Sequence, residues 1–349
     1  MDNLLPAYDD PLFSILAIII LILIVAITSL VMGRVKETKK RKTLKDFLSG
    51  FNKNNHLLEI EEMPFEQALV KPLTLLAKAF NNQGEYQKSI NLNLYLIEHI
   101  SNFFEKEKIL EQLGHTYLKA GFLRRSESIY LEILHKHPRN KNALYDLGIV
   151  YELLQEFDKA LETLEPLKIL GEKTEGIKAH LELNKLLDNK KLSIHDKVEQ
   201  LVALLTTDFY PYRRVMKALF SLDLTAAWNN IQSEKIHSIL DILWFLPSSN
   251  LNLDIISADE TLSAIYLAKG VIAPQEVTAK SNIFAIDTII SAKKSDDNNV
   301  DLIFNYGCEK CKQHFPIAFT RCPKCYAIDA VQIKENLAKK QSQTRYSLL

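Results

Sequence analysis

The spacing of apolar and polar residues divides the chain into three regions. Residues 12–32 are twenty-one residues without a charge, and at ~1.5 Å per residue they predict one helix of about 31 Å, which matches the hydrocarbon thickness of a bilayer. Between residues 65 and 292 the apolar positions recur at helical spacing, which predicts a series of helices. Apolar runs at 300–304 and 327–331 predict strands on either side of a cysteine-rich segment.

Charged residues flank the first apolar run asymmetrically. Acidic residues precede it at positions 2, 9 and 10, and basic residues crowd positions 34 to 45 after it. The positive-inside rule then places the N-terminus outside and everything after Gly33 in the cytoplasm. A cleaved signal peptide is disfavoured because it needs a basic start and a small-residue cleavage site. The basic run 39–42 fits a stop-transfer flank on anionic headgroups better than a nucleic-acid patch.

The helical region contains a sequence repeat. A Leu-Gly pair followed by tyrosine occupies positions 113, 114 and 117 and recurs at 147, 148 and 151, an offset of 34 residues. This is the tetratricopeptide period. A weaker copy covers residues 76–96, and a degenerate copy around 179–205 lacks the glycine. Stacked helix pairs of this kind form a solenoid whose concave groove binds peptides or protein segments.

The first helix of each pair would supply the side chains of that groove. Their mixture does not match the pattern of repeat domains that clamp a C-terminal carboxylate, which need lysine and asparagine at fixed places. The alternative for each of these residues is an ordinary solvated helix face. The candidate partner-binding residues are Lys78, Glu111, His115, Lys119, Tyr145, Ile149 and Glu152, with Thr74 beside them.

All four cysteines of the chain lie near its C-terminus in two Cys-x-x-Cys pairs, Cys308 with Cys311 and Cys322 with Cys325. Two such turns can bring four thiolates around one zinc ion, or alternatively one iron ion. Disulfides are disfavoured because cytoplasmic thiols stay reduced. A redox dithiol would use a single pair beside a βαβ pattern. His314, between the pairs, is interpreted as a solvated loop residue because four thiolates complete the coordination shell.

Composition narrows the classes of function. The chain has 349 residues, enough for two or three domains. Its 43 basic and 43 acidic residues give a formal net charge of zero, which does not favour a nucleic-acid partner. Neither a Gly-x-x-x-x-Gly-Lys-Ser/Thr phosphate loop nor a His-Glu-x-x-His motif occurs. We therefore expect a binding protein and not an enzyme.

These patterns predict an all-α fold with a single N-terminal transmembrane helix, a tetratricopeptide solenoid and a small β-rich four-cysteine knuckle at the C-terminus. Helical spacing continues past residue 209, where Trp228 and Trp244 are expected in the core. The predicted segments are a transmembrane anchor at 1–33, a basic juxtamembrane connector at 34–64, repeats at 65–208, degenerate helical repeats at 209–292, a linker at 293–300, the knuckle at 301–333 and a flexible tail at 334–349.

The order of these parts resembles the lipopolysaccharide assembly protein B family of Gram-negative bacteria, whose C-terminal module is called rubredoxin-like. The resemblance is specific at the Leu-Gly-x-x-Tyr repeats and at residues 306–311 (Tyr-Gly-Cys-Glu-Lys-Cys) and 322–325 (Cys-Pro-Lys-Cys). The chain departs from the family pattern where glycine usually follows the second cysteine and tryptophan usually lies two residues after the fourth. Lys312 and Ala327 occupy those positions.

The resemblance implies an adaptor in the bacterial inner membrane, single-pass, with a periplasmic N-terminus and a cytoplasmic C-terminal domain. Family members are similar in promoting turnover of the deacetylase that commits to lipid A synthesis, through a membrane-bound AAA protease, and in contacting lipopolysaccharide transport components. By the same resemblance, the four cysteines hold a structural metal. That metal folds a module too small to be stable alone, and the knuckle packs onto the solenoid and fixes its groove.

Two other functions remain open from the same cysteines. One is electron transfer through an iron tetrathiolate, although no second redox centre is evident and zinc is favoured. The other is a nucleic-acid-binding zinc ribbon, because basic residues surround the cysteines. Those residues also balance the negative charge of a metal bound by four thiolates: Lys310, Lys312, Arg321 and Lys324.

Overall fold

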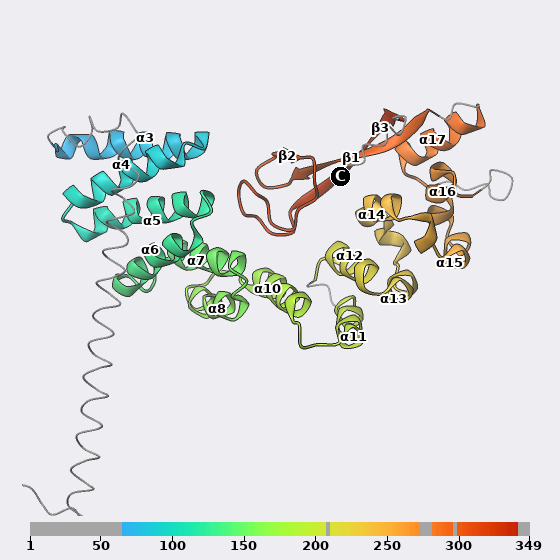
Figure 1. Ribbon diagram of the computed structural model, residues 1–349, viewed down its shortest axis with the longest axis horizontal. Helices are drawn as coiled ribbons and strands as arrows, with labels where there is room; N and C mark the ends of the chain where they lie inside the picture. The colour runs from blue at the N-terminus through green and yellow to red at the C-terminus, as the bar shows by residue number, and fades with distance from the viewer. Residues whose placement is uncertain (1–64, 207–209, 273–280, 296–298, 341–349) are drawn as a thin grey trace, which may run out of the picture. The chain divides into compact units, whose positions relative to one another are not determined.

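The computed structural model describes residues 65–206, 210–272, 281–295 and 299–340. This part of the chain is mostly helical and carries one small antiparallel sheet near the C-terminus (Figure 1). The described residues divide into two compact units, one that ends at His99 and one that begins at Ile100. The repeats predicted as one segment at 65–208 therefore fall into both units, while the residues predicted as separate domains at 209–292 and 301–333 share one unit.

The first unit contains the helix pair α3 (Val70–Gln83) and α4 (Tyr86–His99). The turn between them is built on Gly84, which has φ 83° and ends α3 in the left-handed conformation. The amide of the next residue, Glu85, donates to the Phe80 carbonyl at 2.9 Å, as in a Schellman cap. Ala77 and Leu96 are fully buried in this unit, as expected for small and large positions of a helix pair.

The second unit begins with helix pairs around the two Leu-Gly sequences. Glycine is needed at both because the paired helices approach closely: a Cβ at Gly114 would lie 2.8 Å from the ring of Tyr130, and one at Gly148 would lie 2.8 Å from Thr163 Oγ1. The repeated Leu-Gly thus marks a close contact between paired helices. The helices are α5 (Phe103–Lys119), α6 (Leu123–Lys136), α7 (Lys141–Leu153), α8 (Phe157–Glu162), α9 (Leu164–Ile169), α10 (Glu175–Asp188) and α11 (Ile194–Leu204).

Shorter helices follow and share one apolar core with the sheet. Trp228 and Trp244 are both buried in it, and the Trp228 indole donates to the Asn250 carbonyl at 2.9 Å, so the prediction that they are core residues is confirmed. The elements are α12 (Tyr212–Leu222), α13 (Leu224–Asn229), the 3-10 helix η3 (Ser233–Ile239), α14 (Leu240–Phe245), α15 (Leu253–Ala258), α16 (Glu260–Lys269) and α17 (Phe284–Lys294).

The sheet has the strand order β2-β1-β3, with β1 (Val300–Cys308), β2 (His314–Phe315) and β3 (Val331–Lys339). Both pairings are antiparallel, and β1 and β3 lie beside α17 (Figure 1). Alternate residues of β1, among them Leu302, Phe304 and Tyr306, enter the apolar core of the helices, as period-two strands do. Cys308, the last residue of the same strand, belongs to the cysteine cluster.

The strand β3 is longer than the sequence indicated. It continues to Lys339, which pairs with Val300, so residues 334–339 of the predicted flexible tail are ordered in the sheet. Polar residues alternate along β3 with Val331, Ile333 and Leu337. Such alternation is typical of a strand, but the many charged residues in this segment made it hard to recognise in the sequence.

The predicted fold class and localisation need correction at the membrane anchor. In residues 65–340, as far as the structure describes them, no helix is both long enough and apolar enough to cross a bilayer. Residues 12–32, on which the prediction of a single-pass inner-membrane protein rested, lie outside the described ranges. The fold that the structure supports is mostly helical with a small three-stranded sheet.

Candidate metal centre

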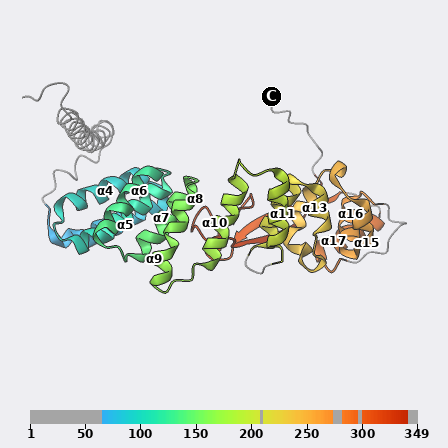
Figure 2. The same cartoon turned by 90° about the horizontal axis from the view of Figure 1, so that it is seen from below.

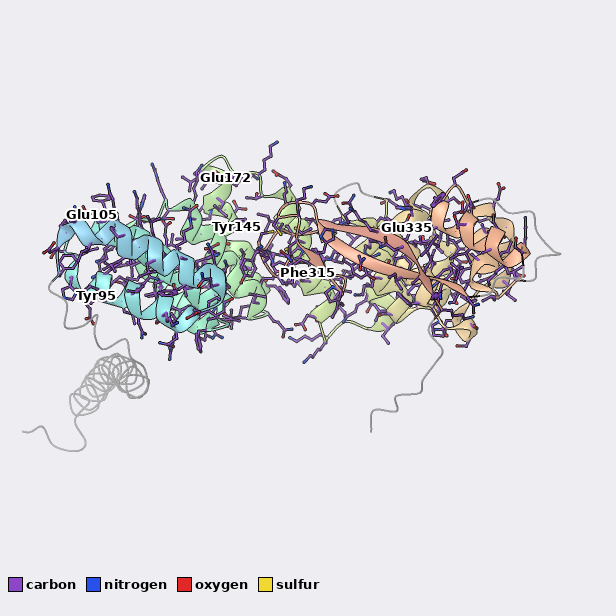
Figure 3. All side chains as sticks on the ribbon, turned by 90° about the horizontal axis from the view of Figure 1, so that it is seen from above. Tyr95, Glu105, Tyr145, Glu172, Phe315 and Glu335 are labelled. Atoms are coloured by element: carbon purple, nitrogen blue, oxygen red, sulfur yellow. The ribbon has the colours of Figure 1, made fainter. Side chains whose placement is uncertain are left out.

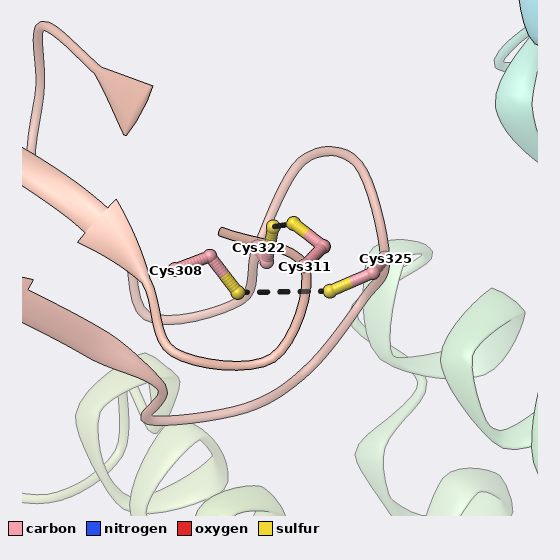
Figure 4. A group of neighbouring side chains, drawn as sticks. All are labelled: Cys308, Cys311, Cys322 and Cys325. Atoms are coloured by element: carbon pink, nitrogen blue, oxygen red, sulfur yellow. Dashed lines mark hydrogen bonds between the residues drawn. The ribbon is translucent and has the colours of Figure 1, made fainter. Parts of the chain in front are cut away.

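The four cysteines converge at the end of the sheet (Figure 4). Cys308 ends β1, Cys311 follows in the next turn, and Cys322 and Cys325 form a second turn in the loop before β3. The Sγ atoms of Cys308 and Cys325 are 3.7 Å apart, as are those of Cys311 and Cys322. All four sulfurs lie within 4.8 Å of one another, and none is in a disulfide.

These distances fit a tetrahedral metal ion. With metal–sulfur bonds of ~2.3 Å, the edge of a tetrahedron of sulfurs is about 3.8 Å, which is close to the observed separations of 3.7 Å. A disulfide would bring two sulfurs to about 2.05 Å. The site therefore suits an ion held by Cys308, Cys311, Cys322 and Cys325, whose role would be to staple the loops. Zinc and iron meet this geometry equally well.

The two cysteine turns have the same backbone conformation. Lys312, after the second cysteine, has φ 58°, and Tyr326, after the fourth, has φ 57°. Their amides donate to the carbonyls of Cys308 at 2.8 Å and Cys322 at 3.0 Å, respectively. The repetition of this turn points both cysteines of each pair toward one centre.

Backbone amides also reach the sulfurs. Burial alone would raise the pKa of Cys308, but the N–H groups of Cys311 and Lys310 and the neighbouring thiols lower it to about 7. These amides favour the thiolate form that a metal needs. At Cys322, buried behind the second turn, burial has the larger effect and raises the pKa to about 12.

The left-handed conformation of Lys312 gives a testable prediction. A non-glycine residue at positive φ carries strain, and glycine, usual here in the resembling family, removes it. We expect Lys312→Gly to stabilise the metal-bound protein by about 0.5–1 kcal/mol in urea unfolding. Lys310→Gly is the matched control, because residue 310 does not have positive φ. It should be neutral or destabilising, and an equal gain in both variants would contradict the explanation.

His314 does not join the cysteines. It is exposed on β2, and its imidazole lies over Gly307, where a Cβ would be 3.6 Å from Nε2. The cysteine cluster comprises the four sulfurs without it.

A buried polar network attaches the knuckle loops to the repeat helices. Glu152, near the C-terminal end of α7, accepts from His180 Nε2 of α10 at 2.7 Å. Two nitrogens of the Arg321 guanidinium also donate to Glu152, Nε at 3.1 Å and Nη2 by a second hydrogen bond, while Nη1 donates to the Tyr326 carbonyl. Arg321 immediately precedes Cys322, so the ion pair lies next to the metal turn. Asp329 Oδ2 in the knuckle loops lies 3.7 Å from His180 Nδ1 of α10, and the loops overlap this helix in Figure 2.

The network continues through α12. Arg214 donates from Nη1 to His180 Nδ1 at 2.6 Å and from Nη2 to Asn184 Oδ1 at 2.5 Å. Because a guanidinium can only donate, His180 accepts at Nδ1 and donates from Nε2 to Glu152. Asp329, from the knuckle, lies 3.6 Å from Arg214 Nη1. Two buried arginines are thus balanced by two carboxylates, one from the helices and one from the knuckle.

The buried carboxylate gives a second prediction. Burial would raise the pKa of Glu152, but hydrogen bonds from His180 and Arg321 and the charge of Arg321 outweigh it and lower the pKa from 4.5 to about 2. The ionised group therefore stabilises the fold above pH 4.5, and this stability is lost as the pH falls through about 2. A shift of this size corresponds to about 3 kcal/mol.

We expect Glu152→Gln to lower the free energy of unfolding by that amount at neutral pH, and the difference from wild type to shrink between pH 4.5 and 2. Urea unfolding of both proteins at several pH values measures the difference in their free energies of unfolding. Effects of acid at other sites are common to both proteins and cancel in this difference. Glu132→Gln, at an exposed position of α6, serves as the control and should differ little from wild type. A difference for Glu152→Gln that is independent of pH would contradict the assignment.

A second contact joins the sheet to the shorter helices. Tyr306 donates its hydroxyl to Asp241 Oδ2 at 2.9 Å, and Arg213 donates to both oxygens of the same carboxylate at 2.5 and 2.6 Å. Tyr306 is two residues before Cys308 on β1. The sheet is therefore held to the helices by polar contacts as well as by its apolar face. The position of the sheet can be followed in Figure 3, where Phe315 on β2 and Glu335 on β3 are labelled.

The structure places the residues of the predicted partner-binding groove in different surroundings. Ile149 and Glu152 are buried, Glu152 by the protein's own Arg321. His115 packs edge-on against Tyr326 of the knuckle, with ring centroids 6.2 Å apart, and lies 3.2 Å from Asp146. The interface with the knuckle therefore occupies part of the surface that was predicted to be free for a partner.

The remaining groove candidates are not gathered into one free surface. Glu111 accepts hydrogen bonds from Asn140 and Asn142, and Lys119 is half-buried beside Lys324. Tyr145 stays exposed at 39%. Lys78, like Thr74, belongs to α3 in the other compact unit.

The polar network was not foreseen from the sequence. Arg321 was interpreted only as a charge near the metal, and His180, Arg214 and Asp329 were not singled out. The sequence did contain one signal for this network: an arginine, Arg321, lies directly before a cysteine ligand. A charged residue in that position is held in place by the cysteine turn and can form a specific ion pair. Its partner, Glu152, lies 169 residues away, beyond any periodic pattern.

Comparison with known proteins is consistent with the resemblance in the sequence but partial. The chain is 24% identical over 144 residues to lipopolysaccharide assembly protein B of Escherichia coli K12, which covers 39% of this chain and 37% of that protein. It is 27% identical over 94 residues to the protein of the same name from Haemophilus influenzae, covering 26% of this chain and 24% of that protein. No known protein-family model matches the sequence. The chain is thus a distant relative of these proteins, and the matches cover between about a quarter and little more than a third of their length.

Proposed function

We propose that this protein is a non-catalytic scaffold that binds other proteins and acts in the assembly or regulation of lipopolysaccharide. The observation that carries the proposal is the attachment of a metal-binding knuckle to the repeat helices by the buried Glu152–Arg321 pair. Such an interface makes a rigid composite surface from two segments distant in sequence. The names of the distant relatives supply the pathway.

The metal in this proposal is structural. The four thiolates leave a tetrahedral ion without an open coordination position, and structural zinc sites are closed in this way. The ion would fix Arg321 and Asp329 in the positions from which they reach the helices. By the family resemblance, the partners are the deacetylase of lipid A synthesis, a AAA protease and lipopolysaccharide transport components.

Cross-linked affinity capture tests the scaffold. The purified full chain would be incubated with the three purified candidate partners, with wild type compared with Cys308→Ser/Cys311→Ser, and retention quantified by mass spectrometry. We expect wild type to retain at least one partner and the double variant to lose most of it. Retention of none, or equal retention by both proteins, would count against the proposal.

Electron transfer is a second candidate because the same four sulfurs accommodate iron, and Cys325 is exposed. An exposed ligand would give electrons a path to the ion. The absorption spectrum of the protein purified without chelators separates the two: visible charge-transfer bands with iron in elemental analysis support this role. A colourless protein that contains zinc would exclude the electron-transfer function.

A further inference from the structure

A cavity of about 350 Å³ lies between α12, η3 and the knuckle within the second compact unit. This volume lies in the usual range of ligand-binding pockets. The cavity is separate from the cysteine cluster, although Glu309, between the first two cysteines, reaches its wall. Arg214 and Asp329 of the polar network also line it.

One wall is apolar and belongs mostly to the knuckle. It is made by Ala318, Phe319, Val331 and Ile333, with Pro211 opposite. Ile317, directly before this wall in sequence, is 74% exposed. The apolar wall of the cavity suits an apolar side chain as occupant.

The opposite wall carries the basic face of α12. Arg213, Arg214 and Lys217 all line the cavity, but Arg213 is paired with Asp241 and Arg214 with Asp329. Lys217 is exposed, and within the described residues no ion pair holds its ammonium group. Lys217 is therefore the cation available to an incoming carboxylate.

The cavity also meets the free edge of the sheet. Val331, Gln332 and Ile333 are consecutive on β3 and all line it, although side chains of a strand alternate between its two faces. Three consecutive lining residues mean that the cavity approaches the strand along its edge. In the strand order β2-β1-β3, β3 is an edge strand of the described sheet, so its backbone can pair with an added strand.

From these observations we propose that the cavity binds an extended segment of a partner protein that adds to the edge of β3, places an acidic side chain on Lys217 and inserts a neighbouring apolar side chain against Phe319. This inference rests on the proposed scaffold function and names the site and the chemistry of the partner. Gln332, Thr320 and Glu309 also line the cavity. A peptide is favoured over other anions because only a peptide uses the strand edge.

Selection from a displayed library of random dodecapeptides tests the proposal. The bait is the metal-loaded full chain, and selected peptides are synthesised with a fluorophore and titrated by anisotropy. We expect peptides that combine an acidic with an apolar residue. Lys217→Glu should weaken their binding about tenfold, whereas Lys190→Glu, an exposed lysine outside the cavity, should leave the Kd unchanged.

Two further measurements distinguish the mode of binding. N-methylation of alternate peptide amides should abolish binding if the peptide pairs with β3, and vesicles of anionic phospholipid or inorganic phosphate should not compete. Absence of acidic peptides, equal Kd for wild type and Lys217→Glu, indifference to N-methylation, or competition by vesicles or phosphate would each overturn the inference. If partner capture persists in Lys217→Glu while peptide selection fails, the scaffold function stands and the cavity assignment falls.

Discussion

Replacing Cys322 by serine is expected to reduce the metal content from one ion per chain to none and to unfold the C-terminal sheet. Cys322 is fully buried and is one of four ligands whose sulfurs lie within 4.8 Å. A structural zinc site contributes about 10–16 kcal/mol of apparent binding free energy in small domains. Removal of one ligand should therefore release the loops from residue 308 to residue 330.

The effect should extend beyond the knuckle. Leu302, Phe304 and Tyr306 lie on the strand that ends at Cys308, and they belong to the apolar core of α12 to α17. We expect the thermal unfolding midpoint of the second unit to fall, and chelation of the wild-type protein to reproduce the change. Elemental analysis with differential scanning calorimetry measures both quantities.

His314→Ala is the matched control, because His314 lies between the cysteine pairs in sequence and outside the sulfur cluster in space. It should retain one metal ion and the wild-type unfolding midpoint. Full metal content in Cys322→Ser, or metal loss without any thermal effect, would contradict the structural role of the ion.

Replacing Arg321 by methionine is the second large effect expected. Arg321 is the cation that the knuckle supplies to Glu152, and both side chains are more than nine-tenths buried. Removing one partner of a buried ion pair leaves an uncompensated charge, which typically costs about 3–5 kcal/mol. We expect a loss of this size in urea unfolding, with faster amide hydrogen exchange in residues 320–330.

A double substitution separates the charge from the packing. In Glu152→Gln/Arg321→Met the carboxylate is gone, while the amide oxygen of glutamine can still accept from His180. This variant should recover part of the stability lost in Arg321→Met. Arg139→Met, at an exposed position after α6, should change the free energy of unfolding by less than about 0.5 kcal/mol. A double variant as unstable as the sum of the singles would argue against direct coupling.

Sequence patterns predicted those features of the protein that depend on residues close together in the chain or on a regular repeat. The Cys-x-x-Cys spacing identified the four clustered sulfurs, and the repeated Leu-Gly identified the helix contacts at Gly114 and Gly148. Both rest on residues close in sequence or on a regular period. The extension of β3 to Lys339 was missed because its alternation is masked by charged residues.

The arrangement of the knuckle on the helices could be anticipated only in outline from the family resemblance. The contact of Glu152 with Arg321 depends on how two distant segments fold back on each other, and no periodicity encodes it. For the same reason the sequence could not show that two residues of the predicted groove, Ile149 and Glu152, are buried by the protein itself. The sequence pattern shows which face a helix presents, whereas the neighbour on that face is a property of the whole fold.

Because β1 carries both core residues and a metal ligand, the order of synthesis matters for this chain. The helices α12 to α17 are complete by Lys294, before the strand that covers their apolar face has been translated. Nascent or prematurely terminated chains would expose that face to water and to chaperones until residues 300–339 emerge and the ion is bound.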